Sequence, residues 1–154
     1  MNDKIKVKNV ILGSGADSLL PLMLVYMLYI IFHGHLSPGG GFQGGVLMVA
    51  VVTILYLGHG YETTTRALSA GFLHGAEGFM SILYVALAMM GVAVGAQFCQ
   101  NILFRHGSIG DLYSAGTIFW MNVTVGAKVL TGVGSIALLM ISLVNEQTAP
   151  EQKG

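Results

Sequence analysis

The sequence contains few charged residues and a single cysteine, and both scarcities limit what the protein can do. Lysine and arginine number seven, as do aspartate and glutamate, so charged residues make up 9% of the 154-residue chain, against about 25% in an average soluble domain. The net charge is zero and no basic cluster with interleaved aromatics occurs, which excludes nucleic-acid binding. The lone Cys99 excludes a disulfide framework within the chain and a C-x-x-C metal or redox motif, and we expect a packed thiol.

Motifs for catalysis are also missing. The sequence has no G-x-S-x-G, no phosphate-binding G-x-x-x-x-G-K and no carboxylate pair at a spacing suited to catalysis. We therefore predict that the chain is not an enzyme by itself and carries no cofactor or redox centre. No signal-peptide cleavage pattern follows residues 1–8, so we expect the first apolar run to remain in the mature protein.

Apolar residues dominate the rest of the chain. They make up 54% of it, with a mean hydropathy of +0.73. A membrane span needs about 20 mostly apolar residues to cross roughly 30 Å of hydrocarbon. Four segments meet that length: 18–35, 42–61, 77–98 and 117–144. The sequence thus predicts an all-α, polytopic membrane protein with four transmembrane helices, forming a single membrane domain over residues 1–154.

The ends of these spans carry polar signals. Asp17 or Ser18 is expected to cap the first helix, with Pro21 in its first turn. The connection 62–76 is expected to contain an interfacial helix or an extension of the third span, and Glu62 and Arg66, four residues apart, are expected to form a surface ion pair. The connection 99–116 carries charged residues and is expected to be an exposed loop: Arg105, His106 and Asp111.

Positive charges predict the orientation in the cell membrane. Four spans place both termini and the middle connection on one side, where five basic residues fall: Lys4, Lys6, Lys8, Arg66 and Lys153. Arg105 alone lies on the other side. Because Lys and Arg concentrate in cytoplasmic loops, we predict that the N- and C-termini are cytoplasmic.

The segment from His33 to Gly45 concentrates glycines and a proline between two apolar runs. It predicts a tight antiparallel hairpin in which backbones meet without side chains between them. Glycine pairs four residues apart, which let helices touch in lipid, occur three times: Gly40 with Gly44, Gly41 with Gly45, and Gly91 with Gly95. These glycines either pack the helices of one chain or also face other subunits.

Lys128 stands near the middle of the fourth apolar run. A charged side chain at the bilayer centre costs roughly 2.5–3.5 kcal/mol on insertion scales, so such residues face protein or water and mark ion pathways. Lys128 is therefore a candidate member of an ion path. The alternative is that its ammonium snorkels along a tilted helix to the interface.

His74 and Glu77 are three residues apart and would share one helix face, with Ser81 one turn further on. Such a cluster could pass protons or cations inward, which makes His74 and Glu77 further candidates for an ion path. The alternative is that Glu77 caps a helix N-terminus at the membrane surface.

Three histidines invite a metal or haem interpretation, which their spacing opposes. His33 and His35 point in different directions on a helix, and His59 lies a span length away. We predict no metal site and expect these imidazoles near the hairpin to hydrogen-bond to backbone or to a neighbour.

The run from Tyr29 to Gly45 resembles the first hairpin of the MnhB-related family, which supplies one of the membrane subunits of Mrp-type multisubunit sodium/proton antiporters. That family's hallmark is G-H-x-x-P-G-G-G-F-x-G-G. The resemblance is close over residues 17–61 and consistent in length and four-span topology elsewhere. It assigns these residues to the family hairpin: His35, Pro38, Gly39, Gly40, Gly41, Phe42, Gly44 and Gly45.

The resemblance implies a non-catalytic membrane subunit of a sodium and proton translocating module, packed against other membrane subunits in the lipid bilayer. The same module also occurs in archaeal membrane-bound hydrogenases and sulfur-reducing respiratory complexes, which would add a hydrogenase-like peripheral arm as a partner. The fourth helix departs from the stand-alone pattern of an acid after a phenylalanine, because Phe119 precedes Trp120-Met121-Asn122. That departure favours the respiratory version. A purely structural membrane subunit of a redox-driven complex and a self-sufficient small transporter are the alternatives.

Overall fold

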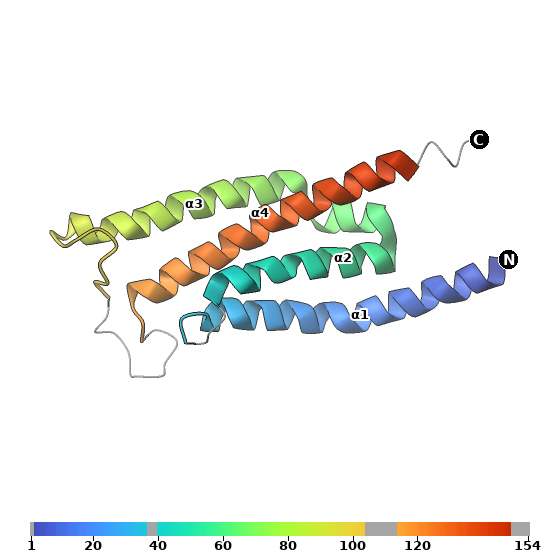
Figure 1. Ribbon diagram of the computed structural model, residues 1–154, viewed down its shortest axis with the longest axis horizontal. Coiled ribbons are helices and arrows are strands. Elements are labelled where there is room, and N and C mark those ends of the chain that lie inside the picture. Colours follow the sequence, from blue (N-terminus) through green and yellow to red (C-terminus); the bar gives the residue numbers. More distant parts are fainter. Residues whose placement is uncertain (1, 37–39, 104–113, 149–154) are drawn as a thin grey trace.

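The structure, a computed structural model, describes residues 2–36, 40–103 and 114–148, with side chains described from residue 10 to residue 147. It contains four helices (Figure 1): α1 (Asn2–His33), α2 (Gly40–Ala67), α3 (Ala70–Ala93) and α4 (Thr117–Thr148). Each is long and apolar enough to cross a membrane. The predicted all-α fold with four transmembrane helices is confirmed.

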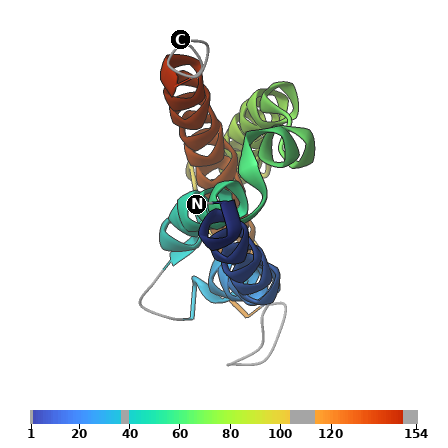
Figure 2. The same ribbon diagram turned by 90° about the vertical axis from the view of Figure 1, so that its right-hand side faces the viewer.

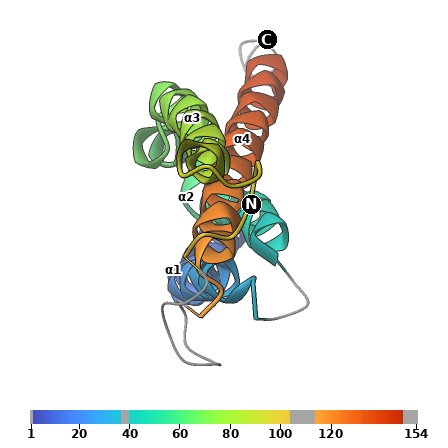
Figure 3. The same cartoon turned by 90° about the vertical axis from the view of Figure 1, so that its left-hand side faces the viewer.

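Helix α4 holds the bundle together. It packs on α2 and on α3, and α2 packs in turn on α1. Seen along the long axis, α1 and α3 lie on opposite sides of α2, and the C-terminal half of α4 lies beside α3 (Figures 2 and 3). Successive helices run in opposite directions, so the two termini lie at one end and the hairpin between α1 and α2 lies at the other (Figure 1).

The core is a narrow line of apolar side chains rather than a broad centre. Its buried members come from all four helices: Met27, Ile31, Met48, Val51, Val52, Leu73 and Leu138. Large apolar side chains point outward as well, and Phe72 and Ile82 of α3 are 74% and 71% exposed. An outward apolar surface suits helices that meet lipid or other subunits.

Helix α1 begins well before Asp17 and Ser18, so the prediction that one of them caps the first helix is wrong. Pro21 consequently lies inside the helix and not in its first turn. The helix continues here against a close neighbour. Ala16 is buried, and a methyl group on Gly58 of α2 would collide with its Cβ.

Helix α2 changes direction at Gly60, whose backbone angles (φ 82°, ψ 179°) are not helical. The Thr64 hydroxyl, fully buried, donates a hydrogen bond to the Gly60 carbonyl at 2.8 Å. Past this point α2 reaches Ala67 and α3 begins at Ala70, so the expected extension of the third span is confirmed. The Arg66 and Glu62 side chains form the predicted surface ion pair at 2.7 Å.

Helix α3 ends at Ala93, earlier than the predicted span, and the chain then folds back on it. The Gln97 carbonyl approaches Gly91 so closely that a Cβ there would lie 2.5 Å from its oxygen. Cys99 falls in this turn and is exposed, so the prediction of a packed thiol is wrong. The charged part of the expected loop lies outside the described residues: Arg105, His106 and Asp111.

Candidate functional site

Glu77 lies deeper in the bundle than its sequence position suggests. Because α3 begins at Ala70, Glu77 is about two turns inside the helix. The first turn of α3 holds no acid, so the alternative that Glu77 caps this helix is wrong. Its carboxylate rests on α4, where a methyl group built on Gly132 would lie 3.2 Å from Oε1. Gly132 is at the middle of α4, so this carboxylate lies halfway along a helix that is long and apolar enough to cross a membrane.

His74 lies one turn before Glu77 and lines a cavity of about 250 Å³. The cavity is bounded by the last turns of α2, the first turn of α3 and the second half of α4. Polar side chains in its wall are Tyr61, Thr65, Ser135 and Ser142. Since one water occupies about 30 Å³ of liquid volume, the cavity has room for several waters next to His74.

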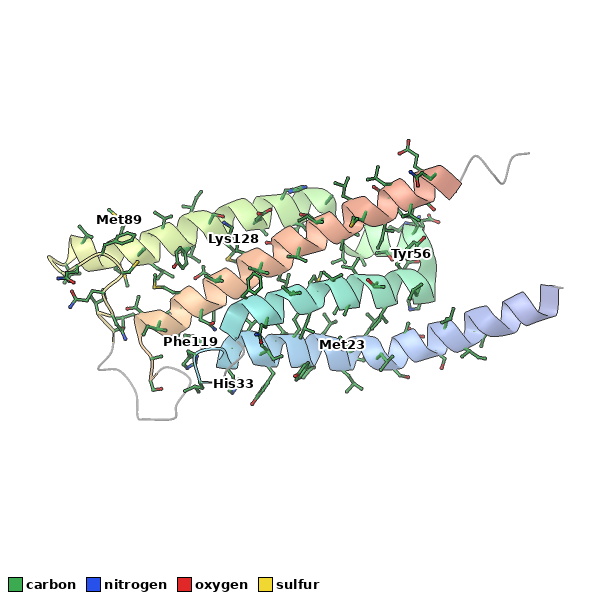
Figure 4. The ribbon with its side chains drawn as sticks, viewed as in Figure 1. Met23, His33, Tyr56, Met89, Phe119 and Lys128 are labelled. Atoms are coloured by element: carbon green, nitrogen blue, oxygen red, sulfur yellow. The ribbon has the colours of Figure 1, made fainter. Side chains whose placement is uncertain are left out.

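Lys128 stands one turn before Gly132 on α4 and is exposed. Figure 4 shows it on the middle stretch of that helix. Within the described residues, ion pairs closer than 4.0 Å are formed by Asp17 with His59 and by Glu62 with Arg66, and neither includes Lys128 or Glu77. Lys128 and Glu77 therefore bring opposite charges to one region without forming an ion pair.

These groups make up one surface, the α3–α4 seam, defined by His74, Glu77, Lys128, Gly132 and Ser135. The Ser135 hydroxyl is buried and donates to the Gly132 carbonyl at 2.8 Å. The carboxylate on this surface can take up a proton or a cation, and the ammonium one turn away acts against a second positive charge. The structure thus brings all three predicted ion-path residues onto one pair of helices.

A second polar site lies at the hairpin end and depends on Asn122. In the sequence, this residue stands out only because the segment after Phe119 lacks the acid of the stand-alone antiporters. Its amide nitrogen donates to the Ile31 carbonyl of α1 at 2.7 Å. Its amide oxygen accepts the Gly41 N–H of α2, also at 2.7 Å. One side chain of α4 therefore forms hydrogen bonds with both the last turn of α1 and the first turn of α2. The signal that could have revealed this role is an amide within an apolar run, because such groups join helices in membranes.

Glycines let the three helices meet around Asn122. A Cβ on Gly45 would lie 2.7 Å from the Gly126 carbonyl oxygen and 2.8 Å from the Leu130 nitrogen, and a Cβ on Gly41 would collide with the Asn122 backbone. Gly44 is held as closely by Ile31 of α1. These glycines therefore pack the helices of one chain against each other, which is one of the two roles that their spacing predicted. Pro38 and Gly39 lie outside the described residues.

The remaining hairpin residues differ in exposure. Gly40 begins α2 with φ 65° and has open space around it, and Phe42 is 60% exposed. The ring of His35 stands edge-on to Phe119, with centroids 5.2 Å apart. Both ring nitrogens are buried, and within the described chain neither has a hydrogen-bond partner. The expected hydrogen bond of this imidazole to the backbone is not found there.

The other two histidines do have polar contacts. His33 stacks on Tyr29, and its Nδ1 lies 3.0 Å from the Tyr29 carbonyl oxygen. His59 Nε2 lies 2.9 Å from Asp17 Oδ1, which joins α2 to α1. In the described ranges, no three His, Cys, Asp or Glu side chains come together as a metal site would require.

Comparison with known proteins matches this architecture to a family. Residues 11–135 match the family described as a domain related to the MnhB subunit of the Na+/H+ antiporter. The chain is similar to a subunit of the Na+/H+ antiporter of Bacillus subtilis (strain 168), with 29% identity over 101 residues that cover 66% of this chain and 69% of that protein. The resemblance expected from the hairpin is confirmed, as is a multi-pass protein of the cell membrane.

Two further similarities involve longer proteins. An uncharacterized protein of Methanocaldococcus jannaschii is 29% identical over 124 residues, which cover 77% of this chain and 47% of that protein. The structure of the membrane-bound sulfane sulfur reductase, an archaeal respiratory membrane complex, contains a chain with a TM-score of 0.70 and 31% identity, over 85% of this chain and 57% of that one. The present chain therefore spans about half the length of these two relatives.

Proposed function

This chain belongs to the family of domains related to the MnhB subunit of the Na+/H+ antiporter, and we propose that it is a non-catalytic membrane subunit of a multisubunit assembly that moves sodium ions and protons. In this proposal the α3–α4 seam lines part of the ion path. Other membrane subunits of the assembly carry the main proton channels, and any redox centre belongs to them or to a peripheral arm.

One observation carries the role of the seam. The Glu77 carboxylate rests against Gly132 at the middle of α4, and no ion pair within the described residues neutralises it. Ionisable groups at membrane depth are costly and belong to ion pathways and proton relays in the proteins that keep them. A carboxylate in this position therefore supports uptake and release of a proton or a sodium ion.

The neighbours of Glu77 supply the two ends of the path. The cavity beside His74 admits water from the end of the bundle that holds the termini, and the imidazole passes a proton to the carboxylate one turn away. Lys128 lies on the other side of Glu77, toward the hairpin. Its positive charge lowers the affinity of the carboxylate for a second cation and so promotes release.

The test uses the complete assembly in everted membrane vesicles, with sodium-dependent proton movement as the readout. We expect Glu77→Gln to abolish most of this movement, and His74→Ala and Lys128→Met to reduce it, while the amount of assembled complex stays unchanged. Glu146→Gln and Arg66→Gln are the matched controls, because both remove an exposed charge that is not one of the seam residues. Transport at the wild-type rate in all three seam variants would disprove the ion-path role.

A second candidate function is a structural membrane subunit of a redox-driven respiratory complex. The similarity to a chain of the sulfane sulfur reductase supports it. Gentle purification of the native complex separates the two, because co-purifying iron–sulfur or nickel subunits indicate the respiratory complex. A set of antiporter-like membrane subunits alone indicates the antiporter.

We also propose that the termini face the cytoplasm, as the distribution of basic residues predicts. Cys99 lies between α3 and α4, opposite the termini, and is exposed. A membrane-impermeant maleimide should therefore label this single cysteine in intact cells from the outside. Labelling in everted vesicles alone would reverse the orientation.

A further inference from the structure

Helix α2 is broken at Gly60, and the break leaves backbone carbonyls without their helical partners. A helical hydrogen bond joins the N–H of one residue to the carbonyl four residues earlier. The non-helical angles of Gly60 (φ 82°, ψ 179°) interrupt each bond that spans it, and the acceptors of those bonds are the carbonyls of residues 57, 58 and 59. The first part of α2 therefore ends in a group of carbonyl oxygens, which is the negative end of a helix dipole.

A cavity of about 290 Å³ adjoins these carbonyls, and its wall is formed by residues 56–60. Because these residues are consecutive and form little more than one turn, the cavity lies over the broken turn itself. It has room for an ion with several waters, at about 30 Å³ per water. Figure 1 shows this part of α2 near the end of the bundle that holds both termini.

Asp17 of α1 brings a carboxylate to the same turn. Its Oδ1 lies 2.9 Å from Nε2 of His59, whose ring belongs to a residue of the cavity wall. The Gly58 carbonyl oxygen faces the same helix, since a Cβ on Gly13 would lie 3.8 Å from it. Gly13 and Asp17 are four residues apart and share one face of α1. A carboxylate and a carbonyl oxygen thus lie on the α1 side of the break.

We propose that the Gly60 break is a binding site for a monovalent alkali-metal cation, held by the carbonyl oxygens of residues 57–59 and the carboxylate of Asp17. In membrane proteins with discontinuous helices, unwound carbonyls and the C-terminal ends of half-helices coordinate sodium ions. The site lies on α1 and α2 and shares no residue with the α3–α4 seam, so the inference goes beyond the proposed function.

The charge at the break favours a monovalent ion. Asp17 supplies one negative charge, and Glu62, the next acid along α2, is 79% exposed and already paired with Arg66. Calcium sites in proteins usually gather several carboxylates. One acid with backbone carbonyls is also compatible with the finding that, within the described residues, no three His, Cys, Asp or Glu side chains come together.

The experiment measures amide hydrogen exchange by mass spectrometry on the purified complete assembly, in sodium chloride and in choline chloride of equal ionic strength. A peptide that covers residues 56–64 reports on the break, because the N–H groups of residues 61–63 lose their helical partners together with the carbonyls. We expect severalfold slower exchange of this peptide in sodium, since a bound cation orders the broken turn. Equal exchange in the two salts would overturn the proposal, as would slower exchange in calcium chloride alone.

Asp17→Asn tests the carboxylate in the same assay. We expect this variant to lose the difference between sodium and choline. Glu62→Gln, which removes an exposed carboxylate two residues after the break, is the matched control and should keep the difference. If Asp17→Asn exchanges faster in both salts but keeps the difference, Asp17 only holds α1 to α2 and the proposed site is wrong. The comparison of salts uses the wild-type assembly and does not depend on how this variant folds.

Glu77→Gln separates the site at the break from the ion path. This variant should keep the sodium-dependent slowing at residues 56–64 even though its transport is lost. If Glu77→Gln removes the slowing, the cation acts from the seam, so the site at the break fails and the ion path stands. If Asp17→Asn alone removes the slowing and all three seam variants transport at the wild-type rate, the site at the break stands and the ion path fails.

Discussion

Two regions of α4 contact their neighbours in opposite ways. At the hairpin end, Asn122 and Gly126 pack against glycines of α2 with almost no side chain between the backbones, and both the nitrogen and the oxygen of the Asn122 side-chain amide are hydrogen-bonded. Along the α3–α4 seam, Glu77 and Lys128 bring charges close to each other without an ion pair. The first region is tightly packed and its polar side chain is fully hydrogen-bonded. The second region is less tightly packed and contains charged side chains that do not pair with each other.

The difference separates what identifies the family from what could move an ion. The hairpin glycines carry the sequence resemblance, and their contacts leave no space for an ion. The seam has a cavity with room for several waters and ionisable groups on two apolar helices. Substitutions at the hairpin should therefore act on assembly, whereas substitutions in the seam should act on transport.

The largest effect is expected for Gly45→Ala. The new methyl group would meet the backbone of α4 at Gly126 and Leu130, which cannot yield as a flexible side chain does, so we expect a loss of about 3 kcal/mol of stability or more. The measurements are the thermal stability of the purified complex and the amount of this subunit in it. Gly15→Ala is the matched control, because a methyl group there meets nothing within 4 Å. Equal stability of the two variants would contradict the closed junction.

A smaller loss of stability, about 2 kcal/mol, is expected for Asn122→Leu. This change removes the hydrogen bonds to the Ile31 carbonyl and the Gly41 N–H and leaves both groups buried without that partner. Thermal unfolding of the complex, compared with Gln147→Leu near the exposed end of α4, measures it. An unchanged unfolding temperature would show that the hairpin does not depend on this side chain.

Gly132→Ala should alter transport without altering stability. The methyl group would lie 3.2 Å from Glu77 Oε1, so the flexible carboxylate moves by a few tenths of an ångström. We expect a severalfold slower sodium-dependent proton movement with normal assembly. Gly75→Ala on α3, which meets no atom within 4 Å, controls for adding a methyl group to a helix. Loss of the subunit from the complex would place Gly132 in the packed region instead.

The smallest effect is expected for Arg66→Gln. Its ion pair with Glu62 is four residues apart on one helix, with both side chains 79% exposed, and such pairs contribute about 0.3–0.5 kcal/mol. The unfolding temperature of the complex and its transport rate should both match the wild type. A clear loss in either would show that this surface meets another subunit.

Hydrophobic length predicted the four helices and the hairpin, but not where α1 and α3 start. The glycines and polar residues around Asp17 resembled a helix start, yet α1 continues through them because small residues allow Ala16 and Gly58 to touch. Similarly, the third span was predicted to begin at residue 77, after the connection 62–76, while α3 already begins at Ala70. Small residues that serve helix contacts are indistinguishable, in one sequence, from small residues that end a helix.

The sequence predicted which residues belong to the candidate site, but not how they are arranged in space. Spacing placed His74 and Glu77 on one face, and hydropathy placed Lys128 at depth, but their meeting depends on how α3 packs against α4. The role of Asn122 was missed for the same reason, since its partners lie 91 and 81 residues away in the sequence. Cys99 was misplaced because the fold-back after α3 rests on a contact at Gly91.

The break at Gly60 ends a stretch of α2 whose length matches the thickness of the hydrocarbon layer of a membrane. A residue with these backbone angles interrupts the helical hydrogen-bond ladder, and irregular backbone is tolerated in a membrane where protein or water satisfies it. From Gly40 to Gly60 the helix rises about 30 Å, which equals the usual hydrocarbon thickness. The pair of Asp17 and His59 lies at the same level as the break. An insertion of one turn into α2 before Gly60 would shift His59 along the bundle while Asp17 stays in place on α1, and so would separate this polar pair.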